Sequence, residues 1–387
     1  MYMKKRVRKR MKWKRVFFTL FLAISFIGGS VCLYYYFVSS DNELKKDNRV
    51  DEQLDGELDE FQDKDTSLSL VMVGDSLIHD KIYNEALKYG NGEYYDFKPM
   101  LSLIKPIVSE YDLAYYNQET ILGGSEIGVS SYPSFNSPYE VGDAMVDAGF
   151  NLISLATNHT LDRGEKAIVN SRNYWDSRKD VLAVGSYTSI EDRERIRVMK
   201  KNDITYTMLN YTYGTNGIKV PGGKEYLVNV WPVALDNPDI DSGYQNYKEQ
   251  VREDIEAVRD KVDVLLVAMH WGMEYEYQPN AYQRDMALYL SSLGVDIIIG
   301  THPHVIQPVT WIDDTLVIYS LGNFISAHEV VNMGNRIGLM SSVEITKTLN
   351  GDGTSNIQIH NLENELLYTY YTNDYQDILV VPFSSME

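Results

Sequence analysis

Cysteine is nearly absent from this chain of 387 residues, which contains a single one, Cys32. One cysteine excludes a disulfide bond within the chain, so a folded domain must be stabilised by its core alone. The preceding Gly29-Ser30-Val31 lacks the Leu-small-small pattern of a lipoprotein attachment site. We therefore interpret Cys32 as a small apolar residue of the hydrophobic run in which it lies.

Basic residues are scarce beyond the first fifteen positions. The net charge is −19, but residues 1–15 carry nine Lys or Arg and no acid, which leaves −28 on the rest of the chain. Such an acidic body repels a phosphate backbone, which argues against nucleic acid as a partner. The chain is long enough for one large or two ordinary domains, and no internal repeat divides it.

Charge is absent altogether from residues 16–38, VFFTLFLAISFIGGSVCLYYYFV. At about 1.5 Å per residue, a helix of this length crosses a hydrocarbon core of roughly 30 Å. The basic tail then predicts a single-pass protein of the cell membrane, with a cytoplasmic N-terminus and an extracellular main domain. A cleaved signal peptide and a buried core helix are the alternatives. The length of the run and the unsuitable Ser-Asp-Asn after it favour an uncleaved anchor.

Apolar residues are rare in residues 39–66, which hold eleven acids and four bases. This composition is typical of a solvated linker that cannot build a core. The pattern changes after it, and we predict the main extracytoplasmic domain over residues 67–387.

Predicted strands and helices alternate along this domain. The strands are predicted at residues 68–73, 113–116, 152–156, 181–184, 204–209, 264–268, 297–299 and 316–321. The helices are predicted at residues 78–89, 99–111, 141–148, 164–175 and 247–261, with one more between the strands at 264–268 and 297–299. The alternation is typical of βαβ units, so we predict an α/β fold with a largely parallel sheet.

Two further stretches modify this prediction. Alternating patterns at residues 338–345 and 356–359 predict antiparallel strands, which would complete a mixed sheet or form a second one. Residues 211–244 are rich in Gly, Pro, Asn and aromatic residues, and a loop of this length usually serves as a lid or a binding wall.

Polar side chains with metal-binding chemistry follow six of the predicted strands. They are Asp75, Asn117 with Glu119, Asn158 with His159 and Asp162, His270, His302 with His304, and Asn323. In an open α/β sheet, ligands gather at the carboxyl ends of the strands, so we expect these side chains to converge. Carboxylate, imidazole and carboxamide groups together suit Mn, Fe or Zn. They are numerous enough to hold two divalent ions about 3.5–4 Å apart.

Short motifs surround these residues. They are Gly74-Asp75, Asn117-Gln118-Glu119, Asn158-His159-Thr160-Leu161-Asp162-Arg163-Gly164, His270-Trp271-Gly272-Met273-Glu274, Gly300-Thr301-His302-Pro303-His304 and Tyr319-Ser320-Leu321-Gly322-Asn323-Phe324. In this order, over about residues 67–345, the motifs resemble the CapA/PgsA family of bacterial capsule-synthesis proteins.

The resemblance implies a fold, a function and partners. The fold would be a metallophosphatase-like sandwich of mixed β-sheets flanked by helices, preceded by the membrane helix. The function would be support for the synthesis, export or anchoring of a capsular polymer, poly-γ-glutamate in this family. The partners would be other membrane proteins of a polymer-synthesis complex, and an anionic polymer or a phosphoester as substrate.

The resemblance also assigns roles to the polar residues. A first metal would be held by Asp75 and His304, and a second by Asn158, His270 and His302. Asn117 or Glu119 would bridge the two ions. His159 would protonate a leaving group or steady a transition state, and Asp162 would orient it.

Two motifs depart from the phosphatase pattern. Phosphatases open with Asp-x-His and continue with Gly-Asp-x-x-Asp, whereas this chain has Asp75-Ser76-Leu77 and Asn117-Gln118-Glu119. The first motif therefore supplies no histidine to the first metal, and the bridging carboxylate of the second motif is not assigned. His79 could supply the histidine ligand, or it could cap the following helix or face solvent.

Several of these residues also have ordinary structural interpretations. Asp75 could cap a helix, His270 could be a hydrogen-bonded core histidine, and Asn323 is equally typical of a turn. Residues 274–277 either line the site entrance or form a solvated loop. Two alternatives to capsule synthesis therefore stay open: a metal-dependent phosphoesterase acting on an envelope phosphate ester, and a non-enzymatic scaffold with a vestigial site.

Overall fold

The computed structural model describes residues 64–230, 241–328, 333–350 and 354–386. The predicted basic tail, transmembrane helix and nearly all of the predicted linker lie outside these residues. Within the described ranges, no helix is both long enough and apolar enough to cross a membrane. The first strand begins at Lys64, three residues before the predicted start of the domain, because residues 64–66 pair with a later strand.

Two mixed β-sheets lie at the centre of the domain. The first has the strand order β14-β13-β12-β1-β2-β3-β4, and β11 pairs with the end of β1. Its strands are β1 (Lys64–Leu77), β2 (Leu113–Asn117), β3 (Leu152–Ser154), β4 (Leu182–Val184), β11 (Asn323–Ser326), β12 (Ile337–Leu349), β13 (Ser355–Tyr370) and β14 (Leu379–Pro382).

The second sheet has the order β5-β6-β7-β8-β10-β9. Its strands are β5 (Met199–Lys201), β6 (Ile204–Thr212), β7 (Val264–His270), β8 (Ile297–Thr301), β9 (Val309–Ile312) and β10 (Thr315–Ile318). Strands β1 to β4 are parallel in the first sheet, and β6, β7, β8 and β10 are parallel in the second. The remaining pairings are antiparallel apart from β1 with β11, so the predicted mixed sheets are confirmed.

Side chains on both faces of the central strands are buried, which explains why their sequences are nearly continuous apolar runs. In β1, Leu70 and Met72 belong to the core between the two sheets, whereas Val71 and Val73 pack on the opposite face. This alternation follows from the two-residue repeat of a strand. Strand β7 repeats it, and the two inner faces together form the central core.

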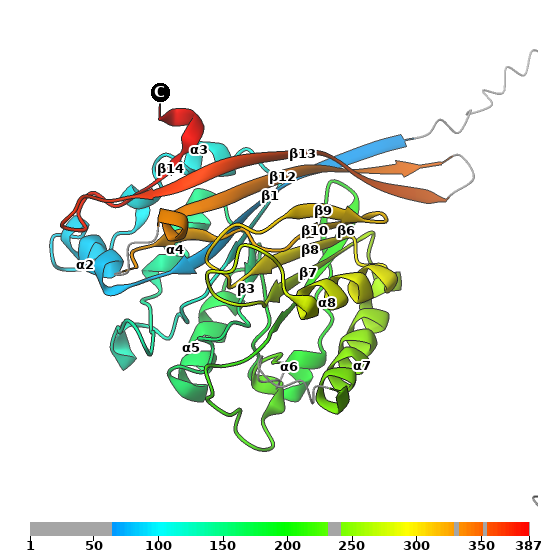
Figure 1. Ribbon diagram of the computed structural model, residues 1–387, viewed down its shortest axis with the longest axis horizontal. Helices are drawn as coiled ribbons and strands as arrows, with labels where there is room; N and C mark the ends of the chain where they lie inside the picture. The colour runs from blue at the N-terminus through cyan, green and yellow to red at the C-terminus, as the bar shows by residue number, and fades with distance from the viewer. Residues whose placement is uncertain (1–63, 231–240, 329–332, 351–353, 387) are drawn as a thin grey trace, which may run out of the picture. The chain divides into compact units, whose positions relative to one another are not determined.

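Helices cover the outer faces of the sheets. The outer face of the first sheet packs against α2 (Asp80–Tyr89), α3 (Lys105–Val108), α4 (Glu140–Ala148) and α5 (Gly164–Asp176). Figure 1 shows α7 (Asp241–Val258) and α8 (Ala281–Ser292) on the same side of β7 and β8, where their apolar residues form another core. The layers are therefore helix, sheet, sheet, helix.

Four strands and two helices differ from the sequence prediction. Strands β5, β9, β11 and β14 were not predicted, and each has only three or four residues. The five-residue helix α6 (Ile190–Glu194) was not predicted either. The single helix predicted over residues 99–111 is wrong. A 3₁₀ turn, η1 (Lys98–Leu101), and the separate α3 occupy this stretch, because Pro106 in the first turn of α3 cannot donate the hydrogen bond that a continuous helix requires.

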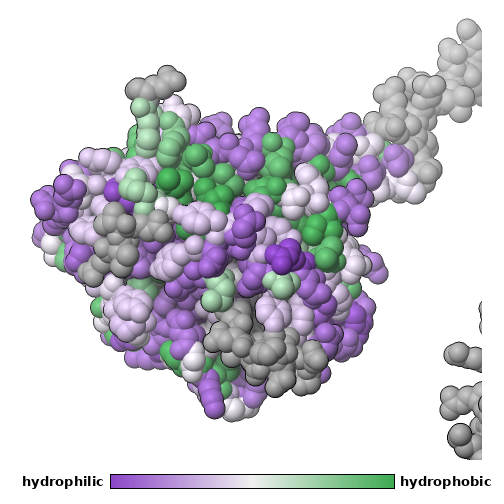
Figure 2. All heavy atoms as spheres, in the orientation of Figure 1, coloured by the Kyte–Doolittle hydropathy of each residue, from purple (hydrophilic) through white to green (hydrophobic). Residues whose placement is uncertain are grey.

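The C-terminal strands form one long antiparallel ribbon. Strand β12 pairs with β1 and β13 pairs with β12, and both extend well beyond the residues predicted for them (Figure 1). Hydrophobic side chains gather over this region on a surface that is otherwise largely hydrophilic (Figure 2). Leu366, Tyr370 and Phe383 are among the exposed apolar residues of β13 and of the turn after β14.

A close backbone approach joins β1 to β11 beside the strand end that carries Asp75. The amide of Asp75 donates to the carbonyl of Gly322 at 2.9 Å. A Cβ atom added at Gly74 would overlap that same carbonyl oxygen. Only glycine at position 74 therefore allows the two strands to meet here.

We expect Gly74→Ala to lower the free energy of unfolding by about 1–3 kcal/mol, the usual cost of overpacking a buried position. Urea denaturation measures this change. Gly214→Ala is the matched control, because a Cβ there has no heavy atom within 4 Å. Equal losses in the two variants would show that the close approach does not matter.

Candidate metal centre

Side chains from both sheets meet at the carboxyl ends of the parallel strands. In the strand ladders Asp75 is paired with Asn117 on one side and with Asn323 on the other, and His270 is paired with Thr301. This convergence produces three groups of residues. Within each group, one potential ligand atom of each residue lies within 4.8 Å of those of the others. The groups are Asp75 with Glu119 and His304, Glu119 with His270 and His302, and Glu274 with His302 and His304.

Glu119 is common to the first two groups. Its Oε1 lies 3.6 Å from Nε2 of His304 and 3.8 Å from Nε2 of His270. The side chain is fully buried, and neither carboxylate oxygen has a hydrogen-bond partner among the described residues. A buried carboxylate without partners is unfavourable, so these oxygens fit a cation that both groups of residues surround.

Asn117 is the other residue predicted for the bridging position, and both polar atoms of its side chain form hydrogen bonds. Its Nδ2 donates to Asp75 at 2.8 Å, and its Oδ1 accepts from Ser154 at 2.6 Å. The Tyr115 hydroxyl in turn lies 2.8 Å from Ser154. Because both ends of the amide are engaged, Asn117 orients Asp75, and Glu119 is the residue shared between the two ligand groups.

His304 lies between carboxylates. Its Nδ1 is 2.9 Å from Oδ1 of Asn323 and 3.3 Å from Oδ2 of Asp75. Burial lowers the pKa of His304, but Glu119 and Asp75 outweigh this effect and raise it to about 10. Burial also raises the pKa of Glu119 well above its ordinary value. A proton on the pair formed by Glu119 and His304 therefore balances the charge of the metal-free cluster, and a divalent cation would displace it.

His270 and His302 are the neutral imidazoles of the centre. Burial, assisted by the neighbouring histidines, lowers the pKa of each well below its ordinary value. Neutral imidazole is the form that binds metal ions. His270 is held by Thr301, 3.0 Å from its Nδ1, and its Nε2 lies 3.0 Å from Oδ1 of Asn158. Nδ1 of the buried His302 has no hydrogen-bond partner in the described part of the chain.

The turn that carries two of the histidines has an unusual backbone. The φ angles of His302 and His304 are +95° and +58°, in a region that residues other than glycine seldom adopt. Hydrogen bonds hold the turn in place, because the His302 amide donates to Asp75 at 3.2 Å and the Tyr275 amide donates to Pro303 at 2.8 Å. Such conformations concentrate at functional sites, where the surrounding structure maintains them.

His159 and Asp162 form a pair beside the cluster. Nδ1 of His159 lies 2.7 Å from Oδ2 of Asp162, which also accepts the amide of Phe135 at 2.7 Å. The Asp162 carboxylate thus fixes the orientation of the imidazole, as the resemblance implies.

Two residues of the stretch predicted as a lid or wall lie at the site and were missed from the sequence. The ring centroid of Tyr213 is 4.5 Å from that of His302. Nδ2 of Asn216 lies 3.2 Å from Nδ1 of His159, and Oδ1 of Asn216 accepts from Asn158 at 3.3 Å. The signal was available, because both follow directly after a strand, as the predicted ligands do.

His79 occupies the N-cap position of α2, as one interpretation of the sequence expects, but its side chain makes no capping hydrogen bond. The solvent interpretation is wrong, because His79 is only 5% exposed. Instead its Nδ1 lies 3.1 Å from the carbonyl of Leu77, and its ring packs edge-on against Phe135 and His328. None of the three ligand groups includes His79, so it borders the centre without joining it.

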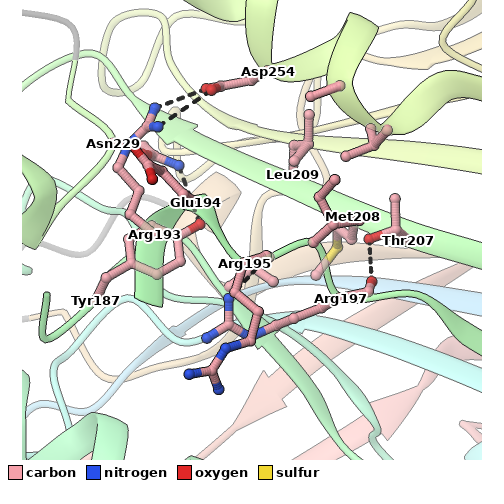
Figure 3. Close-up of a pocket in the computed structure, with 14 residues that line it drawn as sticks. Tyr187, Arg193, Glu194, Arg195, Arg197, Thr207, Met208, Leu209, Asn229 and Asp254 are labelled. Carbon is pink, nitrogen blue, oxygen red and sulfur yellow. Dashed lines mark hydrogen bonds and ion pairs between the residues drawn. The ribbon is translucent and has the colours of Figure 1, made fainter. Parts of the chain in front are cut away.

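A separate cavity of about 230 Å³ lies between β4, α6 (Ile190–Glu194), β6 and α7. Two arginines that line it form ion pairs. The guanidinium nitrogens of Arg193 lie 2.8 and 3.3 Å from the carboxylate oxygens of Asp254 (Figure 3), and Arg197 pairs with Asp192. These pairs fasten α6 to its surroundings. No residue of the histidine cluster lines this cavity, so the metal-binding chemistry lies elsewhere.

The donor set fits a divalent metal. Buried carboxylates and neutral imidazoles suit Mn, Fe or Zn, and the two oxygens of Glu119 and Nδ1 of His302 have no hydrogen-bond partner among the residues that the structure describes. Asn117, Thr301 and Asn323 hold the potential ligands in place through hydrogen bonds. Outer residues of this kind orient the ligands of most protein metal sites.

Comparison with known proteins identifies a family. Residues 69–328 match the family described as "Bacterial capsule synthesis protein PGA_cap". The chain is 31% identical over 180 residues to the "PGA biosynthesis protein CapA" of Bacillus subtilis (strain 168), which covers 46% of this chain and 43% of that protein. It is 25% identical over 264 residues to the "Capsule biosynthesis protein CapA" of Bacillus anthracis, covering 67% of this chain and 59% of that protein.

The buried His79 makes a pH-dependent contribution to stability. Burial, with His328 and His304, lowers its pKa to about 3, so between that value and about 6.5 the unfolded chain binds a proton that the folded chain excludes. The stability is present above pH 6.5 and is lost as pH falls. Between pH 7 and pH 5 we expect wild type to lose about 2 kcal/mol more than His79→Gln in urea denaturation. Parallel pH curves would contradict this.

Proposed function

Because the chain belongs to the family of bacterial capsule synthesis proteins, we propose that it supports the synthesis, export or anchoring of a capsular polymer through a divalent-metal centre. Poly-γ-glutamate is the proposed polymer, since one similar protein is described as acting in PGA biosynthesis. The chain spans about half the length of the curated relatives, so the substrate and partners belong to the proposal.

The buried ligand cluster carries this proposal. Asp75, Glu119 and His304 would hold one ion, and Glu119 with His270 and His302 would hold a second, in a domain of metallophosphatase type. Asn158, whose amide oxygen adjoins His270, is available to the second ion. Bound divalent ions supply Lewis-acid chemistry, in which they polarise an oxygen of the substrate and stabilise developing negative charge.

We propose that this domain acts outside the cell, held by residues 16–38 as a membrane anchor. The uncharged run and the basic residues before it support this orientation. Its partners would then be other membrane proteins of the polymer-synthesis complex. The charge of −28 beyond residue 15 disfavours the binding of nucleic acid, and it disfavours the binding of any other polyanion over most of the surface. Bound divalent ions would reverse that sign locally and give an anionic polymer a place to bind.

A metal-dependent phosphoesterase is the second candidate function, and the His159–Asp162 pair favours it. Nδ1 of His159 lies 2.7 Å from Oδ2 of Asp162, so this carboxylate engages one ring nitrogen and leaves the other to exchange a proton with a leaving oxygen. Phe135 packs edge-on against the imidazole at 4.7 Å, and His159 is only 7% exposed. The imidazole is thus held in one orientation beside the ligand cluster, as a general acid requires.

We expect replacement of both His159 and His302 by Ala to abolish display of the polymer, because the substitutions remove a ligand and the adjoining acid. Surface labelling of the polymer, in cells whose only copy is the variant, measures the effect. Immunoblotting of the membrane fraction shows whether the protein is still present.

The matched control for display is His360→Ala, which removes a histidine of β13 outside the centre. His360 contacts Thr346 at 2.9 Å and is absent from the three ligand groups. Unchanged display in the double variant, with normal amounts of protein, would overturn the proposed role of the metal centre.

The phosphoesterase candidate predicts a different result. With Mn²⁺ and a generic phosphodiester, His159→Gln should lower kcat about 100-fold or more while bound manganese stays unchanged, because general acids contribute at least that factor. Steady-state kinetics with elemental analysis of the same samples measures both. Absence of metal-dependent turnover by wild type on any phosphoester would remove this candidate.

A further inference from the structure

Glu274 lies on the open side of the centre. Its side chain is exposed, yet a carboxylate oxygen comes within 4.8 Å of ligand nitrogens of His302 and His304. From the sequence alone, residues 274–277 could either line the site entrance or form a solvated loop. The third ligand group places Glu274 at the centre itself.

The loop that carries Glu274 is fastened on both sides. Before it, the Trp271 indole donates to the carbonyl of Tyr319 at 2.9 Å. After it, the Tyr275 amide donates to Pro303, the residue between the two histidines, at 2.8 Å. The carbonyl of Glu276 also accepts from the Gln307 side chain at 2.7 Å. The position of Glu274 relative to the histidine turn is therefore set by the fold.

Other partners do not account for this carboxylate. Glu274 forms no ion pair and no hydrogen bond with the described residues, so its carboxylate is available to an ion. What it faces instead is a buried imidazole of His302 whose Nδ1 has no partner.

We propose that Glu274 is a further metal ligand, which together with His302 and His304 closes the centre from the solvent side. The inference rests on the proposed metal centre and adds a third carboxylate to those of Asp75 and Glu119. Two divalent ions carry four positive charges, and neutral imidazoles offset none of them, so each additional carboxylate strengthens binding.

The exposure of Glu274 gives it a role that the buried ligands cannot have. Displacing Asp75 or Glu119 would require the packed strand ends to separate, because both are fully buried. Glu274 can move into solvent without disturbing the core. It is therefore the ligand that an incoming anionic oxygen, from a carboxylate or a phosphate group, replaces.

Metal affinity tests this inference without reference to catalysis. The full-length chain, purified in detergent, is titrated with Mn²⁺ against a chelating dye. We expect Glu274→Gln to raise the Kd for Mn²⁺ about 10-fold or more, because loss of even an outer contact of a metal ligand has an effect of that size. Thermal unfolding of the metal-free protein should be the same for the variant and wild type, because the side chain is exposed.

Two controls separate the possible outcomes. Glu276→Gln removes an equally exposed carboxylate from the same loop and should leave the Kd unchanged, whereas Asp75→Asn should weaken binding strongly. An unchanged Kd in Glu274→Gln, with weakened binding in Asp75→Asn, would overturn the role of Glu274 and leave the proposed function intact. Absence of Mn²⁺ binding by wild type would overturn both.

A spectroscopic measurement guards against an indirect effect of the substitution. Loaded with Co²⁺, wild type and Glu274→Gln should differ in visible absorption, because these bands depend on the number and type of ligand atoms. Identical spectra would show that Glu274 does not contact the ion.

Discussion

The need to compensate the buried carboxylate of Glu119 governs the centre of this protein. Removing a charged group from water costs several kcal/mol unless a partner restores the lost interactions. In the metal-free chain, a proton shared by the pair of Glu119 and His304 supplies that compensation. A divalent cation would supply it in another way, and the pair would release its proton as the ion binds. Protonation and metal binding are thus alternative states of one cluster.

The two sheets make this arrangement possible because they deliver side chains to one place from opposite directions. β1 and β2 bring Asp75 and Asn117 into register, and β7 and β8 do the same for His270 and Thr301. Strand ends held by a packed core move little, so potential ligands are oriented before any ion arrives. Loops contribute the remaining residues; Glu119, Asn158, His302 and His304 are buried, whereas Glu274 is exposed to solvent.

Much of the fold was predictable, because burial on both sides of a strand leaves a continuous apolar run such as residues 264–268. The meeting of Asp75, His270 and His302 followed from the rule that parallel strands end at one edge. Hydrogen bonds between distant side chains leave no such pattern. The sequence therefore could not decide that Asn117 orients Asp75 while Glu119 is shared, or that His79 packs against Phe135.

The centre draws on chain segments far apart in sequence, with Asp75 and His302 separated by 227 positions and joined by a hydrogen bond. A partly folded chain can bring together neighbouring strands but not all of these donors. An ion that needs the complete set therefore discriminates between finished and unfinished molecules, and it stabilises only the finished ones. The metal content of a preparation would report the fraction of chains that have reached their native topology.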